Sequence, residues 1–494
     1  MGVRRPVAPA KYRSHLEENN RSTQTDGQEK PLRAVVAAVQ LTGVSDIEFQ
    51  SSVNELRELA TTLGFELVGT FTQKRDHFDT TAYVGIGKRQ EMRRFVENEP
   101  EPEEGTEESA ASGNAQRTAK SGAARAKEAA KSEADPETRR ADIVLVDHEI
   151  SPSQARNLEI EVGCEVMDRT MVILEIFHRH ARSRAARAQV EIARLGYLAP
   201  RLREQAKLAG PKGRQRSGTG GRGAGEAHSA LDRQKIRDRI AELQKEIDAM
   251  DAERKTQRAR RQERQGLARV VLVGYTNAGK STLMRALTGS EVLVANKLFA
   301  TLDTTVRALH PESVPRALVS DTVGFIKNLP HDLVASFKST LEEAVEASLL
   351  LHVIDASDPG FERQIAVTDE VLKEIGAQEV PRVRIFNKID CVGDEAAQAV
   401  KETALHGAYP NCIVLSAKRQ SDVANLHAAV VAFFQKDLVE AEIFLPWSAQ
   451  QLRGAIFSDC EVIGERSDNE GTHLRIRGGP DIVEALRQQA AVWR

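Results

Sequence analysis

A strand-like segment, a glycine-rich loop and a helical segment follow one another at residues 267–287, and this order restricts the possible folds more than any other feature. The segment reads LARVVLVGYTNAGKSTLMRAL, and its loop fits the pattern GxxxxGK[ST]. Backbone N–H groups of such a loop cradle a polyphosphate, the lysine pairs with β- and γ-phosphate oxygens, and the serine hydroxyl binds Mg²⁺. The predicted nucleotide contacts here are Gly274, Tyr275, Thr276, Asn277, Ala278, Gly279, Lys280 and Ser281.

Three further segments, RALVSDTVGF, RVRIFNKID and IVLSAK, follow in the order that a GTPase domain requires. Asp321 can reach Mg²⁺ through water, and the Gly324 N–H can sense the γ-phosphate. The Asp390 carboxylate can accept both N1–H and N2–H₂ of guanine, which adenine cannot supply, so the predicted base is guanine. The predicted contacts are Asp321, Thr322, Val323 and Gly324, then Asn387, Lys388, Ile389 and Asp390, and finally Ser416, Ala417 and Lys418.

Between the first two motifs lies FATLDTTVR, residues 299–307. A threonine in such a segment can complete the Mg²⁺ shell and moves when the γ-phosphate is lost. Spacing alone leaves Thr301, Thr304 and Thr305 as alternatives.

Composition and length place these motifs in a larger protein. A chain of 494 residues suggests about three domains. The net charge of −3 predicts no polyanion partner by itself, and four scattered cysteines predict neither a disulfide framework nor a zinc site. The basic N-terminus lacks an apolar signal region, and no run approaches a membrane span. We therefore expect a cytoplasmic protein without a membrane anchor.

The chain divides by pattern into five parts. Residues 1–30 are predicted to be a disordered tail. Residues 31–168 alternate strands (including ELVGTFTQ and TAYVGIG) with helices, which predicts an α/β domain, and residues 97–140 are a Glu- and Ala/Lys-rich disordered insertion. Ser151 is the expected N-cap of a helix that starts with Pro152. Residues 267–437 form the GTPase domain, and residues 438–494 form a small α/β domain.

Residues 169–266 are predicted to be a helical hairpin with a Gly/Arg-rich loop, its first helix broken at Ala199–Pro200. The 4,3,4,3 spacing of Ile236, Ile240, Leu243, Ile247 and Met250 indicates a seam that zips the hairpin shut. Eleven Lys or Arg and only two Glu lie between residues 177 and 217, and a second basic run covers 254–269. Such surpluses attract phosphate backbones through counterion release.

With these segments the chain resembles the HflX family of translational GTPases. The resemblance rests on GYTNAGKS, FATLD, DTVGF, NKID and SAK, and on SPSQARNLE, MDRTMVILEIF, QVEIARLGYLAPRL and RGAGE outside the GTPase domain. It implies an N-terminal α/β domain, a helical linker, a G domain and a small C-terminal domain. It also implies GTP/GDP and Mg²⁺ as ligands and binding to the large ribosomal subunit, with splitting or rescue of stalled ribosomes.

The resemblance also assigns residues. It selects Thr301 as the Mg²⁺ ligand beside Ser281, within the predicted contacts Phe299, Ala300, Thr301, Leu302 and Asp303. It places the loop at about 210–225 against ribosomal RNA. It suggests K⁺ as a further cofactor, because potassium-stimulated GTPases that resemble this one carry an asparagine where Asn277 stands; the alternative is that Asn277 braces the loop. The chain departs from the family at Thr304, at RGAGEA and at Ala185 or Ala186, and the 97–140 insertion is not a feature of the family.

Lys280, Asn277 and Gly324 are the predicted catalytic residues. Phe325 stands where many GTPases have a water-orienting glutamine, which predicts slow hydrolysis until an outside element completes the site; the alternative role is a buried anchor. We expect a free monomer that does not bind DNA. The alternative function is a GTP-switched RNA- or protein-binding scaffold without splitting activity. An ATP-driven RNA remodeller and a membrane signalling protein are less consistent with NKID and with the lack of an apolar anchor.

Overall fold

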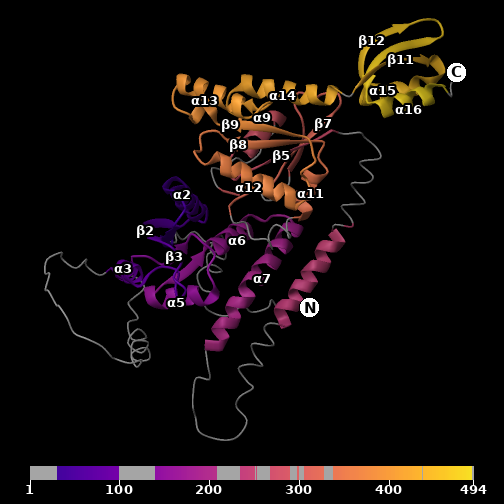
Figure 1. The fold of residues 1–494 in the computed structure, drawn as a ribbon. Helices are drawn as coiled ribbons and strands as arrows, with labels where there is room; N and C mark the ends of the chain where they lie inside the picture. Colours follow the sequence, from indigo (N-terminus) through magenta and orange to yellow (C-terminus); the bar gives the residue numbers. More distant parts are fainter. Residues whose placement is uncertain are drawn as a thin grey trace, which may run out of the picture.

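The computed structural model describes residues 31–98, 140–208, 234–250, 252, 268–289, 298–299, 305–327, 338–436 and 438–491. Figure 1 shows an N-terminal domain in indigo and purple, a GTPase domain in orange and a C-terminal domain in yellow. The predicted tail at 1–30, nearly all of the 97–140 insertion and the hairpin loop lie outside the described residues. The mixed α/β fold class predicted from the sequence is confirmed.

The N-terminal domain is a four-stranded parallel sheet with helices on both faces. Its order is β2-β1-β3-β4. The central strand β1 reads RAVVAAVQL and is buried on both faces, as continuous apolar strands of parallel sheets are. Helices α2 and α6 cover one face, and α3 and α5 cover the other. The elements are β1 (Arg33–Leu41), α2 (Asp46–Thr62), β2 (Glu66–Arg75), α3 (Ile86–Val96), β3 (Ile143–Val146), α5 (Pro152–Val162), β4 (Glu165–Asp168) and α6 (Arg169–His180).

The prediction that TAYVGIG forms a strand of this domain is wrong. The segment is a turn in which Asp79 and Tyr83 form an isolated bridge, and α3 already begins at Ile86. The Asp79 carboxylate accepts the N–H groups of Thr81 and Ala82, which closes the turn. Local hydrogen bonds to an aspartate therefore replace the strand ladder that the apolar pattern suggested.

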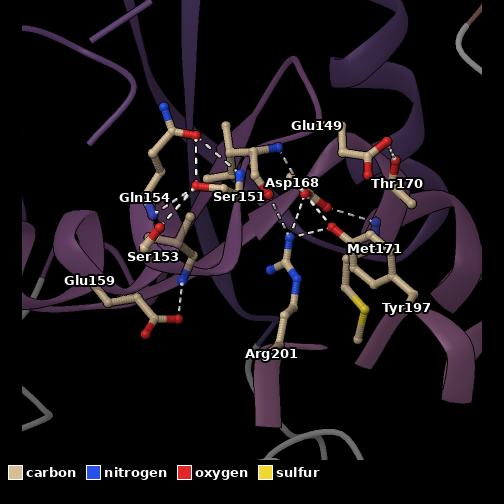
Figure 2. Close-up of polar contacts among 12 residues, drawn as sticks. Glu149, Ser151, Ser153, Gln154, Glu159, Asp168, Thr170, Met171, Tyr197 and Arg201 are labelled. Atoms are coloured by element: carbon tan, nitrogen blue, oxygen red, sulfur yellow. Dashed lines mark hydrogen bonds and ion pairs between the residues drawn. The ribbon is translucent and has the colours of Figure 1, made fainter. Parts of the chain in front are cut away.

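The expected cap of α5 is confirmed. Ser151 accepts a hydrogen bond from the Gln154 N–H, and the Gln154 side chain returns one to the Ser151 N–H. Pro152 occupies the first turn, where its missing N–H costs nothing. Figure 2 shows this capping box beside the buried Asp168.

The predicted helix break at Ala199–Pro200 is wrong. The break lies at residues 181–183, and α7 (Arg184–Leu208) continues through Pro200. Asp168 explains why the helix continues through the proline. Tyr197 and Arg201 lie on either side of Pro200, and both bind the Asp168 carboxylate (Figure 2). The distance from Arg201 Nη2 to Asp168 Oδ2 is 2.6 Å. Asp168 is fully buried and also accepts the Met171 N–H at 2.9 Å. Tertiary contacts thus hold the helix where proline removes a backbone bond.

The hairpin seam pairs α7 with the helix at 234–250. Leu243 and Ile247 are buried against Ala188, and Met250 packs beside them. Arg239 binds Glu191 and Arg184 binds Glu246, so the helices are antiparallel (Figure 1).

The GTPase domain is a six-stranded sheet in the order β10-β9-β8-β5-β7-β6, parallel except for the edge strand β6. The phosphate-binding loop follows the central strand β5. The elements are β5 (Ala268–Gly274), α9 (Lys280–Thr288), β6 (Thr305–Ala308), β7 (Ala317–Asp321), α11 (Lys338–Val345), β8 (Leu349–Asp355), α12 (Phe361–Glu374), β9 (Arg382–Asn387), η3 (Ile389–Cys391), α13 (Glu395–Ala408), β10 (Ile413–Val414) and α14 (Gln420–Gln435).

The C-terminal domain is an antiparallel sheet of order β11-β13-β12 with helices packed on it. Its elements are β11 (Val439–Pro446), η4 (Trp447–Leu452), α15 (Arg453–Asp459), β12 (Glu461–Ser467), β13 (Gly471–Gly478) and α16 (Pro480–Ala491). No helix in the described part of the chain is long and apolar enough to span a membrane.

The N-terminal and GTPase domains share one hydrophobic cluster. It joins residues of α2 and α6 to Tyr275, Phe325 and Phe299 of the GTPase domain. The rings of Phe177 and Phe299 meet edge to face at 4.5 Å, and the Leu298 N–H donates to Thr62 Oγ1 at 3.2 Å. The two domains are therefore packed against each other through segments that flank the nucleotide motifs.

We predict that Asp168→Asn lowers the free energy of unfolding by about 3 kcal/mol, because the buried Arg201 guanidinium then faces a neutral amide in place of the Asp168 carboxylate. The measurement is the midpoint of urea unfolding. The control is Asp46→Asn, which removes an exposed ion pair with Lys74 and should leave the midpoint nearly unchanged. Equal midpoints for Asp168→Asn and the wild type would contradict the prediction.

Candidate nucleotide-binding site

The loop after β5 has the backbone shape that a phosphate cradle needs. Gly274 has φ 142, and a Cβ there would meet the Val353 carbonyl oxygen at 2.2 Å. Gly279 has φ 95, and a Cβ there would lie 2.2 Å from Asn387 Nδ2. Both positions therefore require glycine. The loop ends where α9 begins at Lys280, so the helix N-terminus points at the space that a polyphosphate would fill.

The Lys280 ammonium group lies in this loop. Its Nζ donates to the carbonyl oxygens of Gly274 at 3.0 Å and Tyr275 at 2.8 Å. Burial lowers the pKa of Lys280 to about 8, and the nearby Asp321 carboxylate opposes this shift. Lys280 is thus mostly charged at neutral pH, and a bound polyphosphate would favour the charged form further.

Ser281 and Asp321 present the oxygen donors that a hard divalent cation prefers. Ser281 Oγ donates to Asp321 Oδ2 at 2.7 Å, and Asp321 is fully buried at the end of β7. Thr322 Oγ1 donates to the Leu272 carbonyl at 2.7 Å, which fixes the chain just after Asp321. The residues present fit a magnesium ion that takes its remaining ligands from phosphates and water.

The base-side motifs are joined to the phosphate loop by Asn387. Its Nδ2 donates to the Ala278 carbonyl at 2.9 Å, and its Oδ1 accepts the Ala417 N–H at 3.0 Å. Lys388 Nζ lies 2.7 Å from Asp355. The Ile389 N–H also donates to the Leu415 carbonyl at 3.4 Å. These contacts hold the NKID and SAK segments at the same edge of the sheet as the loop.

Asp390 is poised as an ionised acceptor. Burial opposes its ionisation, but hydrogen bonds from Ser416 and Lys418 outweigh this effect and hold the pKa of Asp390 below its ordinary value. Lys418 Nζ lies 3.3 Å from Asp390 Oδ2. A charged carboxylate at this position can accept two hydrogen bonds from guanine.

The predicted first switch segment, residues 299–307, is described only in part. Phe299 is buried against the N-terminal domain, whereas Ala300, Thr301, Leu302, Asp303 and Thr304 lie outside the described residues. Thr305 pairs with Asp321 in the antiparallel edge of the sheet.

The predicted second switch segment, the chain from Asp321 to Phe325, is paired with the phosphate loop. The Phe325 N–H donates to the Gly274 carbonyl at 3.1 Å, and the Thr276 N–H donates to the Phe325 carbonyl at 2.7 Å. A Cβ on Gly324 would lie 2.8 Å from Thr276 Cγ2 and 3.0 Å from Lys280 Nζ, so Gly324 packs directly on the loop. The Phe325 side chain is 1% exposed and lies in the shared core, which is the anchor arrangement considered from the sequence.

Sequence reasoning missed a buried network that reaches the phosphate loop from the N-terminal domain. The Tyr275 hydroxyl accepts the Lys327 N–H at 2.7 Å, and burial, followed by the charge of Glu55 and a hydrogen bond with it, raises the pKa of Tyr275. Glu55 binds Arg169, which also binds Asp147 at 2.9 Å. No motif connects these positions in the sequence. The segment MDRTMVILEIF, which contains Arg169, was the only part of the family resemblance that included a residue of this network from the N-terminal domain.

A cavity of about 1110 Å³ opens beside the phosphate loop, between α2 and α12. Thr276 and Asn277 line it from the loop, and Asp355 and Ser357 line it from the segment after β8. Glu48 of α2 bridges part of its rim by binding Lys327 at 3.4 Å and Arg363 at 2.5 Å. The N-terminal domain thus forms one wall of the space next to the nucleotide motifs.

Three family models match the chain in order. The GTP-binding GTPase N-terminal model matches residues 50–102 and 112–178, the GTP-binding GTPase middle-region model matches 180–261, and the 50S ribosome-binding GTPase model matches 269–388. Among solved structures, a GTP-binding protein from the archaeon Sulfolobus solfataricus in complex with GDP is similar at 21% identity and a TM-score of 0.39, covering 80% of this chain and 99% of that one.

Relatives named GTPase HflX match much of the chain. The protein from Gluconacetobacter diazotrophicus is 49% identical over 93% of this chain and 98% of its own length. The protein from Caldanaerobacter subterraneus is 36% identical over 92% and 93%, and the protein from Escherichia coli is 39% identical over 68% and 78%. This identity, together with a phosphate loop at the same edge of the sheet as the guanine-type motifs, shows that the chain belongs to the HflX family of P-loop GTPases and is a GTP hydrolase.

Proposed function

We propose that this GTPase binds the large ribosomal subunit and splits or rescues stalled ribosomes, with Mg²⁺ and GTP as ligands and with the cytoplasm as its place of action. The observation that carries the proposal is the basic helical hairpin. Its antiparallel helices join one strongly basic arm, residues 177–208, to a loop that is also rich in Lys and Arg. The match of residues 269–388 to a model described as a 50S ribosome-binding GTPase supports the same partner.

The site residues have the following proposed roles. Lys280 neutralises β- and γ-phosphate oxygens, and the Gly324 N–H contacts the γ-phosphate. Mg²⁺, held by Ser281 and Thr301 and through water by Asp321, would neutralise charge on the β- and γ-phosphates. The buried Phe325 side chain cannot orient a water molecule, so we expect turnover to be slow until the ribosome completes the site.

The second candidate is a scaffold for which hydrolysis only resets binding. The docking of both switch segments on the N-terminal domain favours it, because nucleotide exchange alone could then change the binding surface. Ribosome splitting with a saturating non-hydrolysable GTP analogue separates the two candidates. Binding without splitting, with GTP as with the analogue, would favour the scaffold, and splitting that requires hydrolysis would favour a GTP-driven machine.

We predict that Asp390→Asn lowers GTP affinity about a hundredfold and raises xanthosine triphosphate affinity, because the amide offers a donor where guanine needs an acceptor. Equilibrium binding of fluorescent GTP and xanthosine triphosphate measures both. Asp394→Asn is the matched control, since Asp394 caps α13 and asparagine caps as well as aspartate. An unchanged GTP affinity in Asp390→Asn would remove the residue from base recognition.

We predict that Asn277 makes turnover faster in K⁺ than in Na⁺ and that Asn277→Ala removes the difference. Asn277 is exposed at φ 61, and its amide has no hydrogen-bond partner among the described residues, so its carbonyl oxygen is available to a monovalent cation. The measurement is multiple-turnover GTP hydrolysis in either salt at equal ionic strength. Equal rates in the wild type would contradict a role of Asn277 in binding a monovalent cation.

We predict that large ribosomal subunits stimulate GTP hydrolysis. Changing Arg214 and Arg216 together to Ala should lower this stimulation roughly tenfold at a subsaturating concentration of subunits, because two phosphate contacts are lost. The control changes Arg466 and Arg487, which are exposed in the C-terminal domain. Stimulation that is lost equally in both pairs of variants would contradict a specific role for the hairpin, and a lack of stimulation in the wild type would remove the ribosomal partner.

A further inference from the structure

The side chain of Thr276 is buried without a partner for its hydroxyl. The residue is 6% exposed, and Oγ1 has no hydrogen-bond partner among the described residues. Buried hydroxyl groups almost always have a partner, and leaving one unpaired destabilises a protein. A ligand that supplies the missing partner would remove this cost.

The surroundings of Thr276 indicate which ligand this is. Its methyl group, Cγ2, would lie 2.8 Å from a Cβ on Gly324, and Lys280 Nζ would lie 3.0 Å from the same position. The Thr276 side chain, the switch glycine and the phosphate-binding ammonium group therefore converge on one point. In P-loop GTPases the lysine pairs with oxygens of the β- and γ-phosphates, so this is where the third phosphate of GTP distinguishes it from GDP.

The hydroxyl can reach that point by a simple rotation. Oγ1, Cγ2 and a hydrogen are attached to the same Cβ, and a change of χ1 by about 120° moves all three together, so that Oγ1 takes the place of Cγ2 and Cγ2 takes the place of the hydrogen. The hydroxyl would then stand where the methyl group now contacts Gly324. The backbone stays in place during this rotation, because the Thr276 N–H remains bonded to the Phe325 carbonyl at 2.7 Å.

We propose that Thr276 is a specificity-determining residue whose hydroxyl donates a hydrogen bond to the terminal phosphate of bound GTP and so favours GTP over GDP. The hydroxyl has no partner among the described residues, GDP would not supply one, and GTP would supply a charged acceptor. The role requires only that GTP occupies the phosphate loop, and it is independent of the ribosomal partner.

The test compares Thr276→Val with Thr276→Ser. Valine keeps the methyl group against Gly324 and removes only the hydroxyl, whereas serine keeps the hydroxyl. We expect Thr276→Val to bind a fluorescent non-hydrolysable GTP analogue roughly ten- to a hundredfold more weakly, the loss of one hydrogen bond to a charged group, with GDP affinity unchanged. Thr276→Ser should keep the wild-type ratio of GTP to GDP affinity.

A thermal measurement on the nucleotide-free protein completes the test. Because valine replaces an unpaired buried hydroxyl, Thr276→Val should unfold at the same temperature as the wild type or a higher one. A lower unfolding temperature would mean that the hydroxyl already has a partner, which overturns the proposal. Equal losses of GTP and GDP affinity, or no loss of either, would overturn it as well. GDP binding by both variants shows separately that the phosphate loop is intact.

Discussion

The buried guanidinium of Arg169 is the interaction on which the relation of the two large domains depends. Burial works against its charge, but Glu55 and Asp147 outweigh this effect and raise the pKa of Arg169 above its ordinary value. Removing either carboxylate would leave the buried guanidinium with one charged partner instead of two and so weaken the compensation for its burial. Because Glu55 also interacts with Tyr275, this ion cluster joins the carboxyl edge of the N-terminal sheet to the phosphate loop.

The same interface holds the segments that respond to nucleotide in GTPases. Leu298 and Phe299 contact the N-terminal domain, and Phe325 is buried in the shared core. Switch segments change position when the γ-phosphate is lost. In this protein the packing of Phe299 on Phe177 and the hydrogen bond from Leu298 to Thr62 put the N-terminal domain in direct contact with the first of these segments.

The two wrong predictions have a common cause, which is that local patterns gave way to contacts from elsewhere. TAYVGIG alternates like a strand, yet the Asp79 carboxylate closes it into a turn. Pro200 normally interrupts a helix, yet Tyr197 and Arg201 hold α7 on the buried Asp168. The cap at Ser151 and the heptad seam at Leu243 and Ile247 were predicted correctly, because neighbours in the same helix or an adjacent one decide them.

The sequence by itself determined the GTPase class and the mixed α/β fold class. Glycines at 274 and 279, the lysine at 280 and the motif at 387–390 act through backbone shape and chemical groups that are set within a few residues, so their spacing suffices. Only the tertiary structure placed Arg169, Glu55 and Tyr275 together, buried Phe325 and left the Thr276 hydroxyl without a partner among the described residues. These features depend on residues that are far apart in the chain, such as Glu55 and Arg169, which are 114 positions apart. Their energies come from burial, which sequence spacing does not encode.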